Sequence, residues 1–468
     1  MIPLSFTKLA EIVDGSIHHI SDANTITNQI PEIDSRKIDS EHFFVALVGE
    51  KVDGHDFVES AIASGAQFAL VSKEVNFPSI KVSDVTVALA SLAKYLRRQL
   101  PEMKVVAITG SQGKTTTKDL IAHILQSAGE TVANVGSLNN DLGVPLTLLR
   151  CTSKTKFCVV EMGARHRGDI SRLVEIAVPN VSAALVVGSA HLGEFGSQAD
   201  IAEAKAEIIA GLEDGSTAVL GTYDQFTPHM ADGLKLNVIT FGEKTSCDVR
   251  ASDLEYREGR AHFDLVTPQG RAAVGLQLLG IHQVSNALAA AAIATALNIP
   301  IDSIAASLST AEPASKWRMA LLEEFGLALI NDSYNANPES AAAALRTLVL
   351  LAQERGGESW AILGKMHELG ESSADEHKRI GKLASDIGVD HLLSVGTKDY
   401  LGGAENSPLV EHYFSDGEQA LEIVEHFSEG DVVLVKASRS EGFEKLATAI
   451  INRWQELKVL REKGSQEL

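Results

Sequence analysis

The strongest constraint in the sequence lies in residues 105–118, VVAITGSQGKTTTK, where a β-branched apolar run leads into a glycine-framed turn that carries a lysine. This order predicts a strand, a turn and a helix whose N-terminal N–H groups and peptide dipoles favour an anion. Lys114 adds a positive charge for nucleotide phosphates, and Thr115 adds a hydroxyl for Mg2+. The alternative, a glycine-rich turn with an incidental lysine, explains less of this order. The segment therefore predicts that the chain binds a nucleotide phosphate.

The turn departs from the commonest phosphate-binding motif. G-x-x-x-x-G-K-[ST] would require glycine at position 108, where this chain has Ile108, and only a compressed form from Gly110 to Thr115 is present. This departure narrows the set of families to which the chain can belong.

The length and charge of the chain argue against several broad classes of protein. A length of 468 residues predicts about three domains. A formal net charge of -21 argues against a nucleic acid or an anionic membrane as the main partner. The number of cysteines is odd, they lack metal-ligand spacing, and no signal-peptide pattern is present, which together predict a cytoplasmic protein. The apolar stretch 287–297 is too short to predict a membrane span. We expect it to work as a monomer on small-molecule substrates.

Alternating strand-like and helix-like patterns predict an α/β chain of three domains, which cover residues 1–100, 101–313 and 314–468. The first is predicted to be a small α/β unit. Its helices are expected near residues 5–13 and 83–99, and its strands near 42–48 and 66–71.

The central domain is predicted to hold a parallel, doubly wound sheet. Its strands are expected at 105–108, 157–161, 183–187, 218–220 and 238–241, with a small antiparallel addition over 248–279. The C-terminal domain is predicted to be Rossmann-like, with strands at 327–331, 360–363, 391–395 and 432–435, each followed by a helix.

Three polar side chains are predicted to lie where the central sheet presents its ligand crevice. Glu161 ends one strand, His191 follows the next expected strand by a few residues, and Lys205 lies on the helix after that. Glu161 fits a Mg2+ ligand or a carboxylate that orients water, and it fits a capping or ion-paired carboxylate equally well. His191 and Lys205, each taken alone, fit a structural role better.

Together with their neighbours, these residues resemble a known family. The strings TGSQGKTTTK, NNDLGVP at 139–145, VVEMGA at 159–164, HLG at 191–193, AKAE at 204–207 and GIHQVSN at 280–286 are similar to those of the ATP-dependent Mur ligases of peptidoglycan synthesis. The resemblance covers essentially the whole chain. It implies a three-domain, amide-forming ligase that consumes ATP and releases ADP and phosphate.

The resemblance implies a metal site in the central domain. The residues that match Glu161 and His191 hold Mg2+ in the family, and the residue that matches Lys205 is N-carbamylated. A carbamate turns a cation into a carboxylate-like oxygen ligand, which would explain a lysine beside a second Mg2+. The implied metal ligands are Thr115, Glu161, His191 and Lys205, and the implied catalytic residues are Lys114, Glu161, His191, Lys205 and Arg318.

The resemblance also places ATP contacts on two domains. Asn286 matches an asparagine that contacts adenine, and Arg318 matches an arginine that reaches the γ-phosphate. The implied ATP-binding residues are Gly110, Ser111, Gly113, Lys114, Thr115, Thr116, Asn286, Arg318 and Asn335. Because these contacts are split between two units, we expect hinge closure near residues 312–315, with Arg318 out of reach of the phosphate-binding turn before closure.

Two C-terminal strings indicate which member of the family the chain resembles. INDSYNANP at 330–338 and KASR at 436–439 resemble the form that adds D-alanyl-D-alanine, although residues 332–338 alone also fit a cap-rich helix start. The chain departs from this form at Ala437, where glycine is usual, and at Lys365, where many relatives have aspartate.

The N-terminal strings IDSRK at 33–37, FVALVG at 44–49 and DGHDF at 53–57 look like UDP-recognition elements of the late Mur ligases. Ser35 and Arg36 would meet the diphosphate, for which a hydroxyl and a guanidinium are suited. Without the resemblance, Arg36 fits a solvated surface charge. The implied residues for the UDP substrate are Ser35, Arg36, Ala46, Leu47, Asp53, His55 and Asn140.

These assignments imply that the chain joins D-alanyl-D-alanine to a UDP-N-acetylmuramoyl-tripeptide through an acyl phosphate. Two alternatives stay open. One is another Mur-type or folylpolyglutamate-type amide ligase, and the other is a non-catalytic nucleotide switch that binds a partner when ATP is present.

Overall fold

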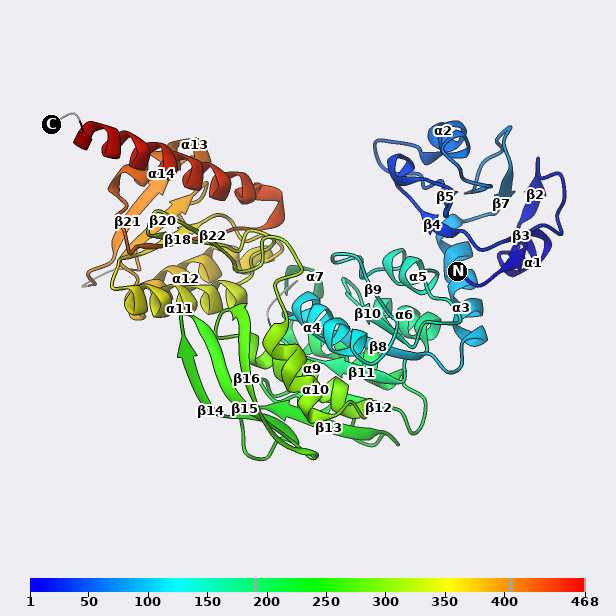
Figure 1. Cartoon of the computed structure of the whole chain (residues 1–468), viewed down its shortest axis with the longest axis horizontal. Helices are drawn as coiled ribbons and strands as arrows, with labels where there is room; N and C mark the ends of the chain where they lie inside the picture. Colours follow the sequence, from blue (N-terminus) through cyan, green and yellow to red (C-terminus); the bar gives the residue numbers. More distant parts are fainter. Residues whose placement is uncertain (189–191, 404–406, 467–468) are drawn as a thin grey trace.

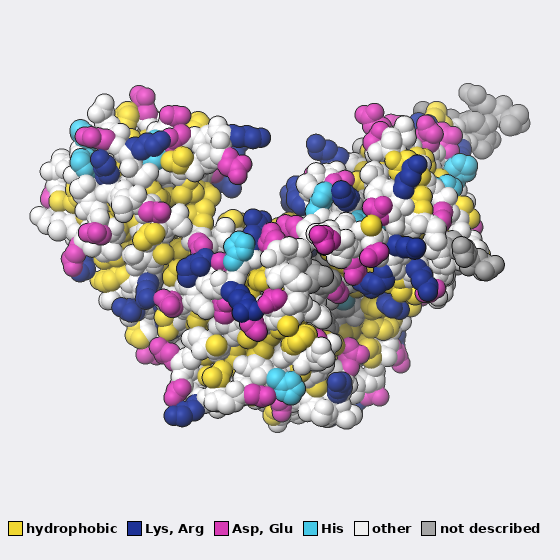
Figure 2. Space-filling model, turned by 180° about the vertical axis from the view of Figure 1, so that it is seen from behind, with side chains coloured by type: hydrophobic (Ala, Val, Ile, Leu, Met, Phe, Trp, Pro, Cys, Tyr) yellow, Lys and Arg dark blue, Asp and Glu magenta, His cyan; other side chains and the backbone are white. Residues whose placement is uncertain are grey.

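The computed structural model describes the whole chain except residues 189–191, 404–406 and 467–468, and it forms three parts that follow one another along an arc (Figure 1). The parts are built around sheets of five, nine and six strands in chain order. Figure 2 shows the N-terminal and C-terminal parts as two lobes on either side of a hollow. The predicted α/β class is confirmed. Among the described residues, no helix has the length and apolar character to cross a membrane.

The N-terminal sheet has the strand order β2-β7-β6-β5-β4, and its neighbouring strands are parallel except for β2 with β7. Its elements are β2 (Ser16–His18), β4 (Ile30–Glu32), β5 (His42–Val45), β6 (Ala69–Val71) and β7 (Ser79–Lys81), with α1 (Phe6–Ile12), α2 (Val58–Ala63) and the pair β1 (Leu4–Ser5) and β3 (Ile26–Thr27). The predicted first helix and the two predicted strands are confirmed, the strands being shorter than expected. The sequence does not predict β2, β4 and β7, because three residues are too few to show a period.

The central sheet confirms the parallel core and the antiparallel addition. From one edge to the other its strands are β16 (Gly270–Leu279), β15 (Arg260–Thr267), β14 (Val249–Arg257), β13 (Asn237–Gly242), β12 (Thr217–Gly221), β11 (Val181–Ala184), β8 (Lys104–Thr109), β10 (Phe157–Glu161) and β9 (Thr131–Ala133). The sheet is parallel from β9 to β14, and β14 to β16 continue it antiparallel. The expected strand 183–187 is displaced, since β11 ends at Ala184 and Val186 instead accepts a hydrogen bond from the turn residue Ser111.

Alternate residues of β8 face opposite sides of this sheet, as the strand period requires. Val106 and Ile108 pack with α4 (Lys114–Gln126), α9 (Gln283–Ala296) and α10 (Ile301–Thr310). Val105 and Ala107 pack with α5 (Gly143–Leu148), α6 (Asp169–Ala177) and α8 (Gln198–Ala210). Because β8 lies between β11 and β10, the turn that follows it opens into the crevice where the strand order reverses.

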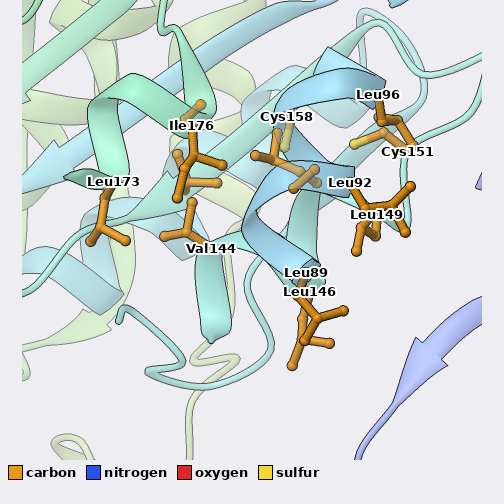
Figure 3. Packing of buried hydrophobic residues seen from close by; sticks show 14 of the residues in the cluster. Leu89, Leu92, Leu96, Val144, Leu146, Leu149, Cys151, Cys158, Leu173 and Ile176 are labelled. Carbon is orange, nitrogen blue, oxygen red and sulfur yellow. The ribbon is translucent and has the colours of Figure 1, made fainter. Parts of the chain in front are cut away.

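Helix α3 (Val85–Gln99) comes before residue 100 but packs on the central part. Its side chains Leu89, Leu92 and Leu96 lie against α5, α6 and β10 (Figure 3). The partners labelled in the figure are Val144, Leu146, Leu149, Cys151, Cys158, Leu173 and Ile176. The N-terminal and central parts therefore share one hydrophobic cluster, and the domain boundary at residue 100 stays a prediction.

The C-terminal sheet has the order β17-β18-β22-β19-β20-β21 and is parallel except for β17 with β18. Its strands are β17 (Ala320–Glu324), β18 (Leu327–Asn331), β22 (Val432–Lys436), β19 (Ser359–Leu363), β20 (His391–Val395) and β21 (Val410–Phe414). The helices α11 (Pro338–Arg355) and α12 (Ser373–Asp386) cover one face, and α13 (Gly417–Ala420) and α14 (Phe443–Gln466) cover the other. The four predicted strands are confirmed. The prediction that a helix directly follows β20 is wrong, because the next element is the edge strand β21.

The central and C-terminal parts also touch away from the linker between them. The turn between β14 and β15 meets helix α11, where Gly259 N donates to Glu354 Oε2 at 2.8 Å. Nearby, Ile281 N donates to Thr347 Oγ1 at 3.4 Å. Short helix α7 (Leu192–Phe195) lies against the C-terminal part as well, because a Cβ on Gly193 would approach Gly370 N to 2.8 Å.

We expect Arg97→Ala to lower the free energy of unfolding by about 2 kcal/mol, because the variant removes the guanidinium donors from the carbonyl oxygens of Ala177 and Val178. The guanidinium is buried and donates to backbone oxygens of Leu100, Ala177 and Val178 at 2.9 to 3.3 Å. The adjacent, exposed Arg98 offers a matched control, and Arg98→Ala should change the value by less than about 0.5 kcal/mol. Urea unfolding followed by circular dichroism measures both. Equal unfolding midpoints for the two variants would contradict this role.

Candidate active site

The phosphate-binding turn is shaped by a glycine that no other residue can replace without strain. Gly113 caps α4 with φ +80°, and a Cβ there would come within 2.3 Å of Asn286 Oδ1. Lys114 begins the helix and folds back, so that its Nζ donates to Gly110 O at 2.7 Å. Burial lowers the pKa of Lys114, Glu161 opposes the shift and Arg318 adds to it. The turn thus presents a cation and free N–H groups at a helix N-terminus, which suits a phosphate.

A cluster of oxygen atoms lies beside this turn, at the carboxyl end of β10. Thr115 Oγ1 donates to Glu161 Oε2 at 2.8 Å, and Asn139 Nδ2 donates to Glu161 Oε1 at 2.7 Å. Glu161 is only 1% exposed, and its backbone N–H donates to Asn134 Oδ1 at 2.7 Å. The sequence left open whether Glu161 is a metal ligand or a bonded structural carboxylate. It is hydrogen-bonded on both oxygens and lies at the phosphate-binding turn.

These groups line a cavity of about 900 Å³ between the central and C-terminal parts. The predicted residues that it brings together are Ser111, Gly113, Lys114, Thr115, Thr116, Asn140, Glu161, Lys205, Asn286, Arg318 and Asn335. Gly110 contributes through its carbonyl oxygen, which accepts from Lys114. His191 lies outside the described residues. The cavity therefore unites most residues that were singled out for phosphate and metal chemistry.

Arg318 reaches the phosphate-binding turn from the far side of the cavity. Its Nη2 donates to Thr115 Oγ1 at 3.1 Å and to Ser137 Oγ at 3.2 Å. Its guanidinium carbon lies 4.0 Å from the ring centroid of Tyr334. The expectation that Arg318 lies out of reach of the turn is therefore wrong for this structure. Arg318 and Glu161 therefore share the hydroxyl of Thr115.

The C-terminal wall of the cavity is held by a buried ion pair. Lys436 Nζ lies 2.5 Å from Asp332 Oδ2 and donates to Asn335 O at 2.8 Å. From the central part, His282 faces this pair, and burial lowers the pKa of His282 to about 4, with a smaller opposing effect of Asp332. His282 is therefore neutral at neutral pH. The string 332–338 also starts α11, because Asn337 and Ser340 form its capping box.

Lys205 is the least compensated charge of the cavity. Its side chain is 4% exposed, and among the described residues it forms no hydrogen bond or ion pair. Burial lowers the pKa of Lys205 to about 7, and the charge of Lys114 adds to the shift. The described residues contain no group of three His, Cys, Asp or Glu side chains that could hold a metal ion. Thr115 and Glu161 are the hard oxygen donors that the described residues place beside the turn.

Comparisons with known proteins identify the family. Family models match at 29–112 (Mur ligase family, catalytic domain), 108–294 (Mur ligase middle domain) and 317–439 (Mur ligase, glutamate ligase domain). A curated relative, the UDP-N-acetylmuramoyl-tripeptide--D-alanyl-D-alanine ligase of Mycobacterium tuberculosis, is 37% identical over 96% of this chain and 98% of its own. The chain belongs to the Mur ligase family.

Two solved Mur ligases support the same assignment. The MurF crystal structure from Acinetobacter baumannii matches this chain with a TM-score of 0.87 and 34% identity, over 96% of this chain and 99% of that one. The MurF ligase from Thermotoga maritima in complex with ADP matches with a TM-score of 0.79 and 28% identity, over 92% and 98%. The three-domain Mur ligase fold predicted from the sequence is thereby confirmed.

Except for Asn140, the residues predicted for the UDP substrate lie apart from this cavity, in the N-terminal part of the Mur ligase. Segments 33–37 and 46–55 follow the adjacent parallel strands β4 and β5, so both lie at the same edge of the sheet. Arg36 is exposed and pairs with Asp34 at 2.8 Å, whereas Ser35 begins a short 3-10 helix.

Within 46–55, Asp53 accepts from His55 Nδ1 at 2.6 Å and also pairs with Lys73. Ala46 is buried and Leu47 O accepts from Gly54 N at 2.7 Å. Of the predicted UDP-site residues, Asn140 is the one that lines the cavity.

The two departures from the family pattern do not line the cavity. Ala437 is fully buried, and a Cβ built on Gly364 would lie 2.8 Å from Ala437 Cβ. Lys365 is exposed, and its backbone oxygen accepts from Ser438 N at 3.1 Å. Ala437 therefore takes part in packing between the ends of β19 and β22, whereas the contact of Lys365 with Ser438 uses only the backbone.

Sequence reasoning missed the polar loop that supports Glu161 and Arg318. Asn134, Ser137 and Asn139 all follow β9, a three-residue strand that the sequence analysis does not predict. The position of this loop in the chain could have revealed it, because residues that follow a strand parallel to β10 must lie at the carboxyl end of β10. The loop is now assigned to the site by its hydrogen bonds to Glu161, Thr115 and Arg318.

We expect Gly113→Ala to weaken ADP binding at least about tenfold, since φ is positive and the new Cβ would clash with Asn286. Gly215→Ala is the matched control, because Gly215 has φ +83° with nothing within 4 Å of a Cβ. Both variants carry the same backbone strain, and only one carries the clash. Isothermal titration with ADP distinguishes them. Equal affinities would show that the clash at Asn286 does not matter.

Proposed function

We propose that this Mur ligase joins D-alanyl-D-alanine to a UDP-N-acetylmuramoyl-tripeptide at the expense of ATP, in the synthesis of peptidoglycan precursor. The observation that carries the proposal is the cavity in which Lys114, Glu161 and Arg318 meet from two parts of the chain. Near full-length relatives that carry this activity in their names support the choice of substrates.

The chemistry requires a carboxylate to attack a polyanionic phosphate. The terminal carboxylate of the tripeptide attacks the γ-phosphorus, ADP leaves, and an acyl phosphate forms. The amine of the dipeptide then attacks the acyl carbon, loses a proton, and phosphate departs as the amide forms. Lys114, the N–H groups of the turn and Arg318 stabilise negative charge on the transferring group.

The oxygen cluster beside the turn fits Mg2+. The hydroxyl of Thr115 and the carboxylate of Glu161 are hard oxygen donors 2.8 Å apart that would hold Mg2+ together with oxygens of the nucleotide phosphates. Bound Mg2+ would screen the repulsion between carboxylate and phosphate. A second ion would use His191 and a modified Lys205.

The remaining assignments follow the same proposal. The N-terminal part receives the uridine nucleotide through Ser35, Arg36, Ala46, Leu47, Asp53 and His55, and Asn140 meets the muramoyl peptide. Residues 1–100, 101–313 and 314–468 act as the UDP-binding, ATP-binding and Rossmann-like domains. The enzyme works as a cytoplasmic monomer.

A phosphate-release panel tests this function. We expect steady release only when ATP, UDP-N-acetylmuramoyl-tripeptide and D-alanyl-D-alanine are all present. Replacing the dipeptide by glutamate, or the tripeptide by a shorter muramoyl peptide, should remove it. Lys114→Ala should abolish release but keep binding of the UDP substrate, because the two sites lie on different parts. Release that depends on glutamate would indicate another amide ligase, and ATP binding without release would indicate a switch.

Lys205 meets the chemical requirement for carbamylation. Only a neutral amine attacks carbon dioxide, and burial that lowers the pKa of Lys205 to about 7 supplies that form near neutral pH. Lys118 is also buried, yet it forms an ion pair with Asp119 at 2.8 Å, whereas Lys205 has no such partner among the described residues. A carbamate on Lys205 would replace an uncompensated cation by an oxygen ligand beside Glu161.

We therefore expect the protein to take up ¹³C-labelled bicarbonate as a carbamate on Lys205, measured by carbon NMR. Because the folded-state pKa is lowered to about 7, the signal should grow as pH rises through 7. Lys205→Ala should lose the signal and the ligase activity, and short carboxylic acids should restore part of the activity. A signal that persists in Lys205→Ala would place the carbamate elsewhere, for example on Lys118.

A further inference from the structure

The linker between the central and C-terminal parts is tied to the helix that carries the phosphate-binding turn. Ser315 Oγ donates to Asp119 Oδ2 at 2.6 Å. Asp119 lies on α4, and Ser315 lies just before Arg318 in the chain. The hydrogen bond therefore fixes the segment that delivers Arg318 to the cavity.

The other oxygen of the same carboxylate holds a buried lysine. Asp119 Oδ1 lies 2.8 Å from Lys118 Nζ, which is almost fully buried. Lys118 Nζ also donates to Asn134 O at 3.0 Å and to Gly136 O at 3.1 Å. The loop that follows β9 is thereby fixed against α4 by a charged group that makes three contacts.

Arg318 meets this same loop, which closes the network. Its Nη2 donates to Ser137 Oγ and to Thr115 Oγ1, while its buried Nε finds no hydrogen-bond partner among the described residues. The guanidinium is therefore oriented by two segments, the linker before it and the loop that carries Ser137. Asp119 holds the linker through Ser315 and the loop through Lys118.

We infer that Lys118 and Asp119 are a positioning pair that aligns Arg318 for phosphoryl transfer, through Ser315 on one side and the 134–137 loop on the other. Neither residue lines the cavity that holds Lys114 and Glu161. They act through backbone segments and not on the reacting atoms. The inference rests on the proposed function, in which Arg318 meets the γ-phosphate.

The test removes the hydroxyl of Ser315 and compares the effect on turnover with that of removing the hydroxyl of Thr310. Ser315→Ala should lower kcat about tenfold, the effect of losing one hydrogen bond to a charged group, and leave KM for the UDP substrate unchanged. Ser315→Thr keeps the hydroxyl and should restore the rate. Thr310→Ala is the matched control, because Thr310 also bonds to α4, at 3.3 Å from His123 Nε2, but is exposed and precedes the linker. It should stay within about twofold of the unaltered protein.

A second readout does not depend on activity. Trp317 lies between Ser315 and Arg318 and is half-buried against Arg439, whereas Trp360 and Trp454 are buried. Acrylamide quenching of tryptophan fluorescence therefore reports on the linker, and it should rise in Ser315→Ala and in Asp119→Asn but not in Thr310→Ala.

The outcomes separate this inference from the proposed function. Unchanged kcat and unchanged quenching in Ser315→Ala would overturn the inference while the ligase activity stands. Equal losses of kcat in Ser315→Ala and Thr310→Ala would also overturn it. The loss would then follow from breaking any contact between α4 and the chain near the linker, and not from the bond to Asp119. If the unaltered protein shows no ligase activity, the proposed function fails, and quenching still decides whether Asp119 holds the linker.

Discussion

Repulsion among cations is the constraint on which the arrangement of the site depends. Lys114 and Lys205 are both removed from water, which lowers the pKa of each. The charge of Arg318, on the opposite wall, lowers the pKa of Lys114 further, and the charge of Lys114 lowers the pKa of Lys205 further. Glu161 opposes this repulsion at Lys114. The fold holds the cations together with backbone oxygens, packing and the ion pair of Lys118 with Asp119. An arriving polyphosphate relieves the repulsion, so the cavity favours an anion before any specific contact forms.

The helices, strands and turns predicted best are those whose local sequence pattern matches their surroundings in the folded protein. The apolar run before Gly110, the glycine turn and the helix from Lys114 all appear as expected, because a buried parallel strand and a helix N-terminus leave clear local signals. The strands β18 and β20 were located to the residue for the same reason. Most of the candidate phosphate contacts could therefore be named from the sequence.

The features that the sequence does not predict depend on contacts between segments that are far apart in the chain. The strand β9 is short and half-buried, so the residues directly after it, Asn134 and Ser137, carry no recognisable pattern, and only the string that begins at Asn139 resembles the family. The contact of Arg318 with Thr115 depends on how two separately folded parts meet. Likewise, the apolar face of α3 is evident in the sequence, but its partner on α5 and α6 is not. The domain boundaries and the role of the N-terminal residues stay predictions for the same reason.

The contact between Gly259 and Glu354 has a mechanical consequence. The C-terminal part is held to the central part at the linker around Ser315 and, separately, at the turn between β14 and β15. Once the contacts at Ile281, Gly193 and Arg318 open, a rigid body held at these two points keeps a single rotation, about the line that joins them. The line from the linker to this turn thus defines an axis about which Arg318 and Lys436 would travel together relative to Lys114.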